Sequence, residues 1–252
     1  MDSETLLSYT LDIAEEMLKS GAEVYRVEDC VNRICMTYDA KRIDVFTITS
    51  TIIATYEDSA GKHITQTRRI EHYHTNLTRM HRLNNLSRYI CENRPDLNYI
   101  HDQFESIINE QPYSLFIQCF AYAVIGSSFT CFFGGHIIDG IIGSGIAIIL
   151  RLAFYILDLT HINQILTNIL VSFTLCFLAF VIHFLIPVTL SNKIIIGNIM
   201  LLIPGIGLTN SMRDMISGDT MAGMLRFCEA CLIALAIAAG YILAALICQT
   251  AM

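Results

Sequence analysis

The sequence is poor in positive charge and lacks a recognisable export signal. Its 16 Lys and Arg residues are outnumbered by 23 Asp and Glu residues, so the formal net charge at pH 7 is −7. Proteins that bind nucleic acids carry basic patches, and this acidic balance argues against a nucleic-acid partner. The opening segment, MDSETLLSYTLDIAEEMLKS, is acidic and amphipathic, without the basic segment or the apolar core of a signal peptide. We therefore expect the N-terminal part of the chain to stay in the cytoplasm.

Motifs that would indicate an enzyme or a metal site are also missing. The sequence contains no P-loop, no GxGxxG fingerprint and no nucleophile elbow. Cys228 and Cys231 form a CxxC pair, but structural zinc usually needs four ligands and no second pair accompanies them. We interpret the neighbouring His72, His74 and His81 as a solvated polar edge, because a metal site would need a carboxylate or cysteine at defined geometry. We predict no enzyme and no bound metal or cofactor.

Charge is distributed unevenly along the chain. Residues 1–113 carry 12 of the 16 Lys and Arg residues and 18 of the 23 Asp and Glu residues. The remaining residues, 114–252, are almost uncharged, and the whole chain is 54% hydrophobic with a mean hydropathy of +0.51. This asymmetry predicts a cytoplasmic domain over 1–113 followed by a transmembrane domain over 114–252.

The N-terminal part alternates between two kinds of hydrophobic periodicity. Helical spacing of apolar residues predicts two helices, and Gly21 between them fits a helix C-cap. A segment rich in Val, Ile, Thr and Tyr then predicts two or three antiparallel strands, and two more helices follow, separated by Pro95. These elements form a small α+β domain with predicted helices at 3–19, 22–38, 76–93 and 96–109 and strands at 43–49, 51–57 and 62–70.

The C-terminal part contains five apolar segments of about the length that spans a membrane. Only helices satisfy their backbone groups in lipid without closing a barrel, so we predict an α-helical membrane protein. Basic residues gather at the ends that would be cytoplasmic, which predicts a cytoplasmic N-terminus and an outside C-terminus in a multi-pass inner or plasma membrane protein. The five-helix bundle is predicted to use residues 114–133, 136–157, 164–186, 193–212 and 221–248.

The stretch LLIPGIGLTNSMRDMISGD, residues 201–219, is unusually polar for such a segment. Pro204, Gly205 and Gly207 predict a helix break, after which a new helix starts near Leu208. Thr209 or Asn210 would cap that helix, and its N-terminus would attract an anionic group. The sequence therefore predicts a discontinuous helix of the kind that binds substrates in transporters.

Charged residues follow this break. Asn210, Arg213 and Asp214 share one face of the new helix, and Asp219 lies beyond Gly218. Charges within a span are costly and usually mark a pathway or a site. An alternative is a plain cytoplasmic loop, in which Arg213 sets the orientation and Asp214 is its surface partner. The other isolated acid is Asp139, which either complements a helix dipole or carries a proton.

Three motifs together resemble the threonine/serine exporter family, and more closely its split-gene form, which includes an inner-membrane succinate exporter subunit. They are SGAEVYRVED near the start, FFGGHIIDG after the first apolar segment and LLIPGIGLTNSMRDMISGD. The resemblance implies a cytoplasmic domain followed by five spans, and a separate small integral membrane protein that supplies the second half of the transporter. The positions that match the family motifs are Gly21, Glu23, Arg26, Glu28, Asp139, Pro204, Gly205, Thr209, Asn210, Arg213, Asp214, Gly218 and Asp219.

These observations lead to a functional hypothesis. We expect one subunit of a proton-coupled secondary transporter that exports small carboxylate-bearing metabolites such as threonine, serine or succinate. Its substrate contacts are predicted at Thr209, Asn210 and Arg213. Its candidates for proton coupling are Asp139, Asp214 and Asp219. The partners would be the lipid bilayer, the substrate, the second membrane protein and, through stripes of small residues, further copies of the chain. Alternatives are a scaffold or regulatory subunit whose cytoplasmic domain senses a ligand, and a membrane-anchored hydrolase.

Overall fold

The computed structural model describes residues 3–71, 73–160 and 162–251, and within it the chain forms two compact units. The first contains the residues up to Gln111 together with Gly205–Cys228, and the second contains Pro112–Pro204 together with the residues from Glu229 onward. Residues 205–228 follow most of the apolar segments in the sequence but pack with the N-terminal residues. The chain therefore passes from one unit to the other three times.

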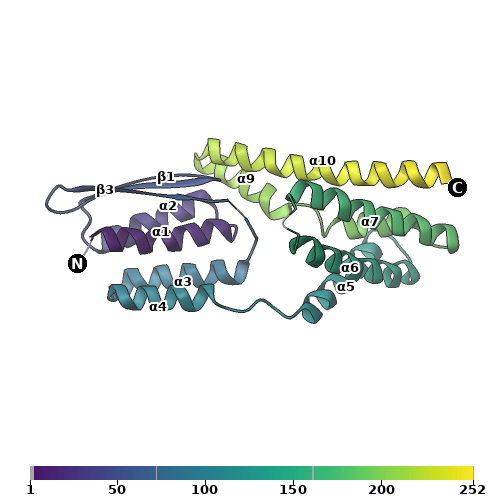
Figure 1. Cartoon of the computed structure of the whole chain (residues 1–252), viewed down its shortest axis with the longest axis horizontal. Helices are drawn as coiled ribbons and strands as arrows, with labels where there is room; N and C mark the ends of the chain where they lie inside the picture. The colour runs from purple at the N-terminus through teal and green to yellow at the C-terminus, as the bar shows by residue number, and fades with distance from the viewer. Residues whose placement is uncertain (1–2, 72, 161, 252) are drawn as a thin grey trace. The chain divides into compact units, whose positions relative to one another are not determined.

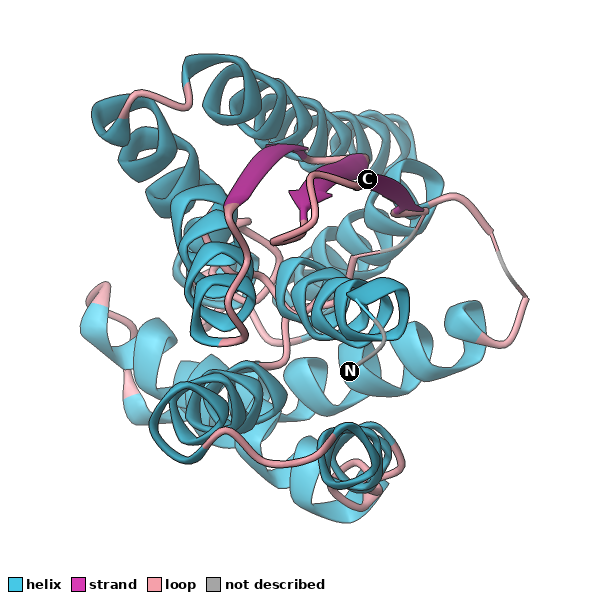
Figure 2. Cartoon of the chain, turned by 90° about the vertical axis from the view of Figure 1, so that its left-hand side faces the viewer, coloured by secondary structure: helices cyan, strands magenta, loops and turns pink. Residues whose placement is uncertain are grey.

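The first unit is built in layers (Figures 1 and 2). An antiparallel sheet, with strand order β1-β2-β3, covers one face of the helices α1 and α2, whose other face packs on α3 and α4. The bounds are close to those expected from the hydrophobic periodicity: α1 Ser3–Lys19, α2 Val24–Thr37, β1 Arg42–Ile48, β2 Thr51–Glu57, β3 His63–Arg69, α3 Leu77–Asn93 and α4 Leu97–Ile108.

The core of this unit lies between the sheet and α1 and α2. Alternate residues of β1 and β2 face it, because side chains along a strand point to opposite sides. The pairs Ile43–Tyr56 and Thr47–Ile52 are buried together, whereas Phe46, one position away, is 55% exposed. One face of these two strands is therefore buried and the other is more exposed.

The turn between α1 and α2 depends on one glycine. Gly21 has φ +97°, a left-handed conformation that costs glycine nothing. Its N–H donates to Leu18 O at 3.1 Å, and Ala22 N donates to Met17 O at 3.0 Å, which is the Schellman pattern of a helix end. Gly21 is thus the predicted C-cap, and the chain enters α2 after only a short turn.

The second unit is helical. It contains α5, α6, α7, α8 and the greater part of α10, and α8 packs against the three helices that precede it. Among the described residues, α5, α6, α7 and α10 are long and apolar enough to cross a membrane. The bounds are α5 Leu115–Phe132, α6 Ile137–Asp158, α7 Gln164–Leu185, α8 Ser191–Ile199 and α10 Thr220–Ala251.

Close helix packing in this unit uses glycines at the contacts. A Cβ on Gly197 of α8 would lie 2.5 Å from the backbone nitrogen of Thr130 in α5. A Cβ on Gly240 of α10 would lie 2.5 Å from Ile169 O in α7. The small-residue spacing of the sequence is typical of such contacts, in which helix backbones approach directly.

The segment predicted as one span over 193–212 is not one helix. It consists of the nine-residue α8 and of α9, Gly205–Ser217, joined by residues 200–204. At 1.5 Å per residue α8 is about 14 Å long, half of the roughly 30 Å of hydrocarbon in a bilayer. The five-helix count is therefore not confirmed, and the residues that the structure describes contain four long apolar helices.

The helix after the break begins earlier than expected. It starts at Gly205 and not near Leu208, because proline is well suited to precede a helix, where its missing N–H and fixed φ do no harm. Thr209 and Asn210 consequently lie inside α9 and do not cap it. The hydroxyl of Thr209 instead donates to Gly205 O at 2.9 Å.

Candidate functional site

Two motifs that are about 190 residues apart in sequence meet in the first unit. The turn formed by residues 21–24 contacts side chains of α9 and of the first turns of α10. The amide Nδ2 of Asn210 donates to Gly21 O at 2.8 Å, and the guanidinium of Arg213 pairs with the carboxylate of Glu23. The polar face predicted for the helix after the break is therefore directed at the N-terminal motif.

The centre of this contact is a buried ion pair. Asp214 is 0% exposed and Arg226, near the start of α10, is 8% exposed. Oδ2 of Asp214 lies 3.2 Å from Nη1 of Arg226, and Nη2 of Arg226 donates to Ala22 O at 3.1 Å. The pair links α9, α10 and the 21–24 turn at one place.

Asp214 also caps α2 from outside that helix. The residue at the N-cap position, Glu23, makes no side-chain cap, and Val24 N donates instead to Oδ1 of Asp214 at 3.1 Å. An unpaired N–H at a helix start needs an acceptor, and the positive end of the helix dipole favours an anionic one. A carboxylate from α9 thus satisfies the first turn of α2.

Three carboxyl groups near this contact have raised pKa values. Burial raises the pKa of Asp214, and the charge of Arg226 and the N–H of Val24 act in the opposite direction. Burial also raises the pKa of Asp219. The pKa of Glu28 is raised by burial and then by the charge of Asp219. A proton is thus held more easily at these groups than at a carboxyl in water.

The other polar residues of the first motif stabilise the N-terminal domain itself. Glu28 Oε1 accepts a hydrogen bond from Thr47 N at 2.8 Å, which ties α2 to β1. Arg26 donates to the side-chain oxygen of Asn84 in α3 at 3.2 Å. Of the four residues in this motif, Gly21 and Glu23 contact α9, while Arg26 and Glu28 hold the layers of the domain together.

Asp139 lies in the second unit, at the start of α6. Its Oδ2 accepts from His136 N at 2.8 Å and its Oδ1 accepts from Leu190 N at 2.9 Å. The carboxylate, which is 1% exposed, therefore caps α6 and fixes the connection between α7 and α8. Of the two alternatives for Asp139, this geometry fits the acid that complements a helix dipole, and the contact with Leu190 N is an additional one.

The sequence interpretation missed Arg226 and mispaired Asp214. Arg226 is not among the site residues expected from the sequence, although a lone arginine in an apolar helix start needs a carboxylate partner if it is buried. The alternative in which Asp214 is the surface partner of Arg213 is wrong, because Asp214 is buried against Arg226 and Arg213 pairs with Glu23.

No metal centre accompanies this contact. Within residues 3–71, 73–160 and 162–251, there is no group of three or more His, Cys, Asp or Glu side chains that could hold a metal ion. Cys228 and Cys231 are free thiols in α10. Of the three histidines noted above, His72 lies outside the described residues.

The comparisons with known proteins identify the family. The model of the ThrE family, described as "Putative threonine/serine exporter", matches residues 8–248. Comparison with curated proteins gives no match, and comparison with solved structures gives none. The matched range covers most of both units and all three motifs, and it ends at Cys248 in α10. ThrE is a family of membrane exporters and not of enzymes, in agreement with the prediction from the missing catalytic motifs. The chain belongs to this threonine/serine exporter family.

Proposed function

We propose that the chain is one subunit of a secondary transporter that exports small carboxylate-bearing metabolites, driven by the proton gradient across the inner or plasma membrane. Threonine and serine are the first candidates, and a dicarboxylate such as succinate is the other. Family membership supports export in general. The observation that carries the proposal is the break between α8 and α9, since discontinuous helices form the substrate sites of many transporters.

The proposed substrate contacts are Thr209, Asn210 and Arg213, on the helix that follows the break. Arg213 is the residue best suited to bind a carboxylate. Its side chain is 58% exposed, and a guanidinium has five donors, of which the Glu23 carboxylate uses only part. Substrate binding and the contact with the N-terminal domain would then compete for the same side chain.

Among the proposed proton-coupling residues, Asp214 has the strongest physical support. Its carboxylate is buried, its pKa is raised, and it holds α9, α10 and the start of α2 together. Because its pKa is raised in the closed contact, the closed contact binds this proton more tightly than an opened one, so proton binding would favour the closed contact and proton release would favour its opening. Asp219 and Asp139 remain candidates, the first through its raised pKa and the second through its buried position.

Chain connectivity supports five crossings, of which the fourth is discontinuous. The bond from Leu190 N to Asp139 means that α6 and α8 start at the same end of the second unit. The segment α8–α9 then leads to the N-terminal domain, and α10 leads away from it. We propose a cytoplasmic N-terminus, an outside C-terminus, and a separate small membrane protein, with or without further copies of this chain, to complete the transporter.

Replacement of Arg213 tests the proposed site. We expect Arg213→Ala to lower export of labelled threonine, serine or succinate from membrane vesicles at least tenfold, because a charge-assisted contact with the carboxylate is lost. Arg33→Ala is the matched control, since Arg33 is also exposed and paired with one acid, Asp29, on α2. Unchanged export by Arg213→Ala, with normal insertion, would refute the role of Arg213.

One observation favours a second function, that of a regulatory or scaffold subunit. Asn210, Arg213 and Asp214 all contact the N-terminal domain, as expected for residues that position a domain. This alternative predicts that the chain is required for assembly of the complex while export tolerates Arg213→Ala. Co-purification of the complex, measured beside export with the same variant, separates the two functions.

A further inference from the structure

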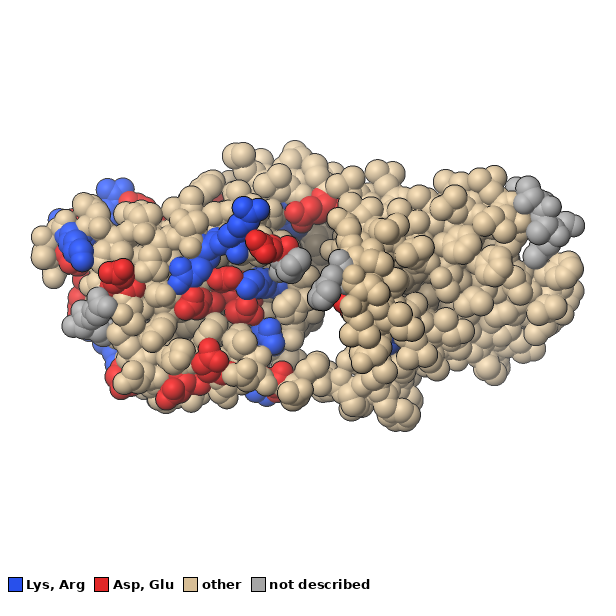
Figure 3. Space-filling model, in the orientation of Figure 1, with Lys and Arg blue, Asp and Glu red and all other residues tan. Residues whose placement is uncertain are grey.

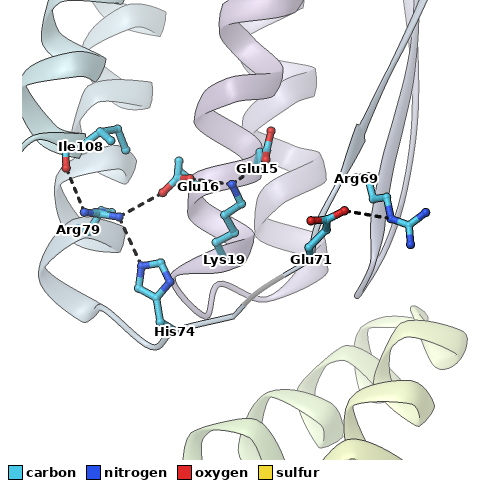
Figure 4. Close-up of a pocket in the computed structure, with 8 residues that line it drawn as sticks. All are labelled: Glu15, Glu16, Lys19, Arg69, Glu71, His74, Arg79 and Ile108. Carbon is cyan, nitrogen blue, oxygen red and sulfur yellow. Dashed lines mark hydrogen bonds and ion pairs between the residues drawn. The ribbon is translucent and has the colours of Figure 1, made fainter. Parts of the chain in front are cut away.

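A cavity of about 350 Å³ with a charged lining opens in the first unit, beside the end of α1 that leads into the 21–24 turn (Figure 4). Its walls come from the C-terminal end of α1, from the end of β3 and the segment that follows it, from the start of α3 and from the end of α4. In Figure 3, charged side chains of both signs gather on the visible face of this unit. The cavity is notable because its lining combines three carboxylates, three cationic side chains and one histidine.

One side of the cavity is rigid. Nη1 of Arg79 lies 3.3 Å from Oε2 of Glu16, and Nη2 of Arg79 donates to Ile108 O at 3.1 Å. The two side chains of this ion pair are 18% and 15% exposed. His74 contacts the same guanidinium, with Nε2 3.4 Å from Nη1. These contacts fix the wall formed by α1 and α3.

The opposite side is loose. Nε of Arg69 is 3.7 Å from Oε1 of Glu71, and the two side chains are 82% and 68% exposed. An exposed pair at this separation contributes little to stability, so its partners can be exchanged for a ligand at low cost. Lys19 lies between the two sides, with its ammonium 2.7 Å from Glu15 and 3.0 Å from Glu16.

The charges of the lining select the kind of ligand. Burial, followed by the charge of Arg79, lowers the pKa of His74, so this imidazole is neutral at pH 7. The three acids and three bases then balance. A ligand of one sign would gain attraction from one set and equal repulsion from the other. A small molecule with a cation and an anion close together is attracted by both.

We propose that this cavity binds a small zwitterionic amino acid. The ligand's carboxylate would be held by Arg69 and Lys19, and its ammonium group by Glu71. The ligand would replace the loose Arg69–Glu71 pair with two pairs of its own, while the rigid wall keeps its shape. The inference goes beyond the proposed transport function, since it assigns a separate site to the N-terminal domain and rests only on the geometry and charge of the cavity.

Equilibrium dialysis of the full chain with labelled L-threonine and L-serine tests the inference. All variants carry Arg213→Gln, so that the proposed transport site does not contribute. We expect binding on this background, and at least a tenfold weaker affinity when Arg69→Gln and Glu71→Gln are added. The matched control adds Arg82→Gln and Glu110→Gln, which remove another exposed pair of the same unit that does not line the cavity, and should leave the affinity unchanged.

Each outcome of the dialysis supports or overturns the proposal. Loss of binding only in the Arg69/Glu71 variant, with no competition from succinate, supports a zwitterion site. Absence of binding on the Arg213→Gln background, equal binding in both double variants, or equal competition by succinate overturns it. Because no flux is measured, a positive result would stand even if the chain transported nothing, and a negative result would leave the transport proposal untouched.

Discussion

The buried pair of Asp214 and Arg226 allows a quantitative prediction. Replacement of Arg226 by alanine leaves the Asp214 carboxylate buried with only Val24 N as its partner. It also removes the hydrogen bond that Arg226 donates to Ala22 O. The change therefore acts on the contact between α9, α10 and the 21–24 turn and leaves the sheet and its core intact.

The expected cost follows from the burial of both partners. Breaking a buried ion pair by removing one partner costs about 3–5 kcal/mol, because the other charge stays desolvated. The exposures of 0% for Asp214 and 8% for Arg226 justify that range without a reduction for solvent screening. At about 1.4 kcal/mol per tenfold change, the closed contact should weaken by roughly 100-fold to several thousandfold.

Hydrogen exchange at Val24 measures this directly, since its amide donates to Asp214. We expect Arg226→Ala to lower the protection of the Val24 amide at least 100-fold while amides of α3 keep theirs. Asp214→Asn removes the charge that burial disfavours and keeps an acceptor for Val24 N, so the protection of the Val24 amide should change far less than in Arg226→Ala. The double variant should resemble Asp214→Asn alone and fall well short of the sum of the two single losses.

The effect should also depend on pH. The folded-state pKa of Asp214 is raised, so the folded protein binds this proton more tightly than the unfolded chain does. The contribution of Asp214 to the free energy of unfolding is therefore greatest at a pH below the ordinary carboxyl pKa. It declines as the pH rises toward the pKa that Asp214 has in the folded protein. Protonation relieves the stranded charge, and the loss in Arg226→Ala should be larger at pH 8 than at pH 5. Unchanged Val24 protection at both pH values would refute the reasoning.

Two further predictions concern other parts of the chain. Glu28→Gln should stabilise the N-terminal domain at pH 7 but not at a pH below the ordinary carboxyl pKa, because the raised pKa of Glu28 shows that its ionised form is unfavourable in the folded protein. Urea unfolding of both proteins at the two pH values measures the difference in the free energy of unfolding. The same difference at both pH values would contradict the prediction. Gly240→Ala should destabilise the second unit by about 1–3 kcal/mol, because the new Cβ would lie 2.5 Å from Ile169 O. Faster maleimide labelling of the buried Cys176 reports that loss, and Gly145→Ala is the control, since its Cβ would meet nothing within 4 Å.

Local patterns in the sequence predicted most elements of the first unit. Apolar residues recur with a helical period in α1 and α2, and this period changes in the strands that follow. Gly21 marks the turn between the two helices. The long apolar helices of the second unit were equally evident, because their length and composition are set by the bilayer. Helix starts were harder to predict where proline and glycine occur together, as at Pro204 and Gly205.

Long-range contacts were beyond the local patterns. Nothing near Asp214 in the sequence indicates that its partners are Val24 and Arg226, because they come from segments that only the tertiary fold brings together. The polar stretch after Pro204 predicted a site and a helix break, and the break was found at a slightly different residue. The contact of this stretch with the 21–24 turn follows from the fold and not from periodicity.

The central claim is that this chain is part of a transporter, and flux in proteoliposomes tests it most directly. The chain would be reconstituted with and without the proposed second membrane subunit, loaded with labelled threonine, serine or succinate, and placed under an imposed pH gradient. The account predicts efflux only when both proteins are present, with a rate that depends on the gradient. No efflux of any of the three substrates from vesicles that contain both folded proteins would contradict it.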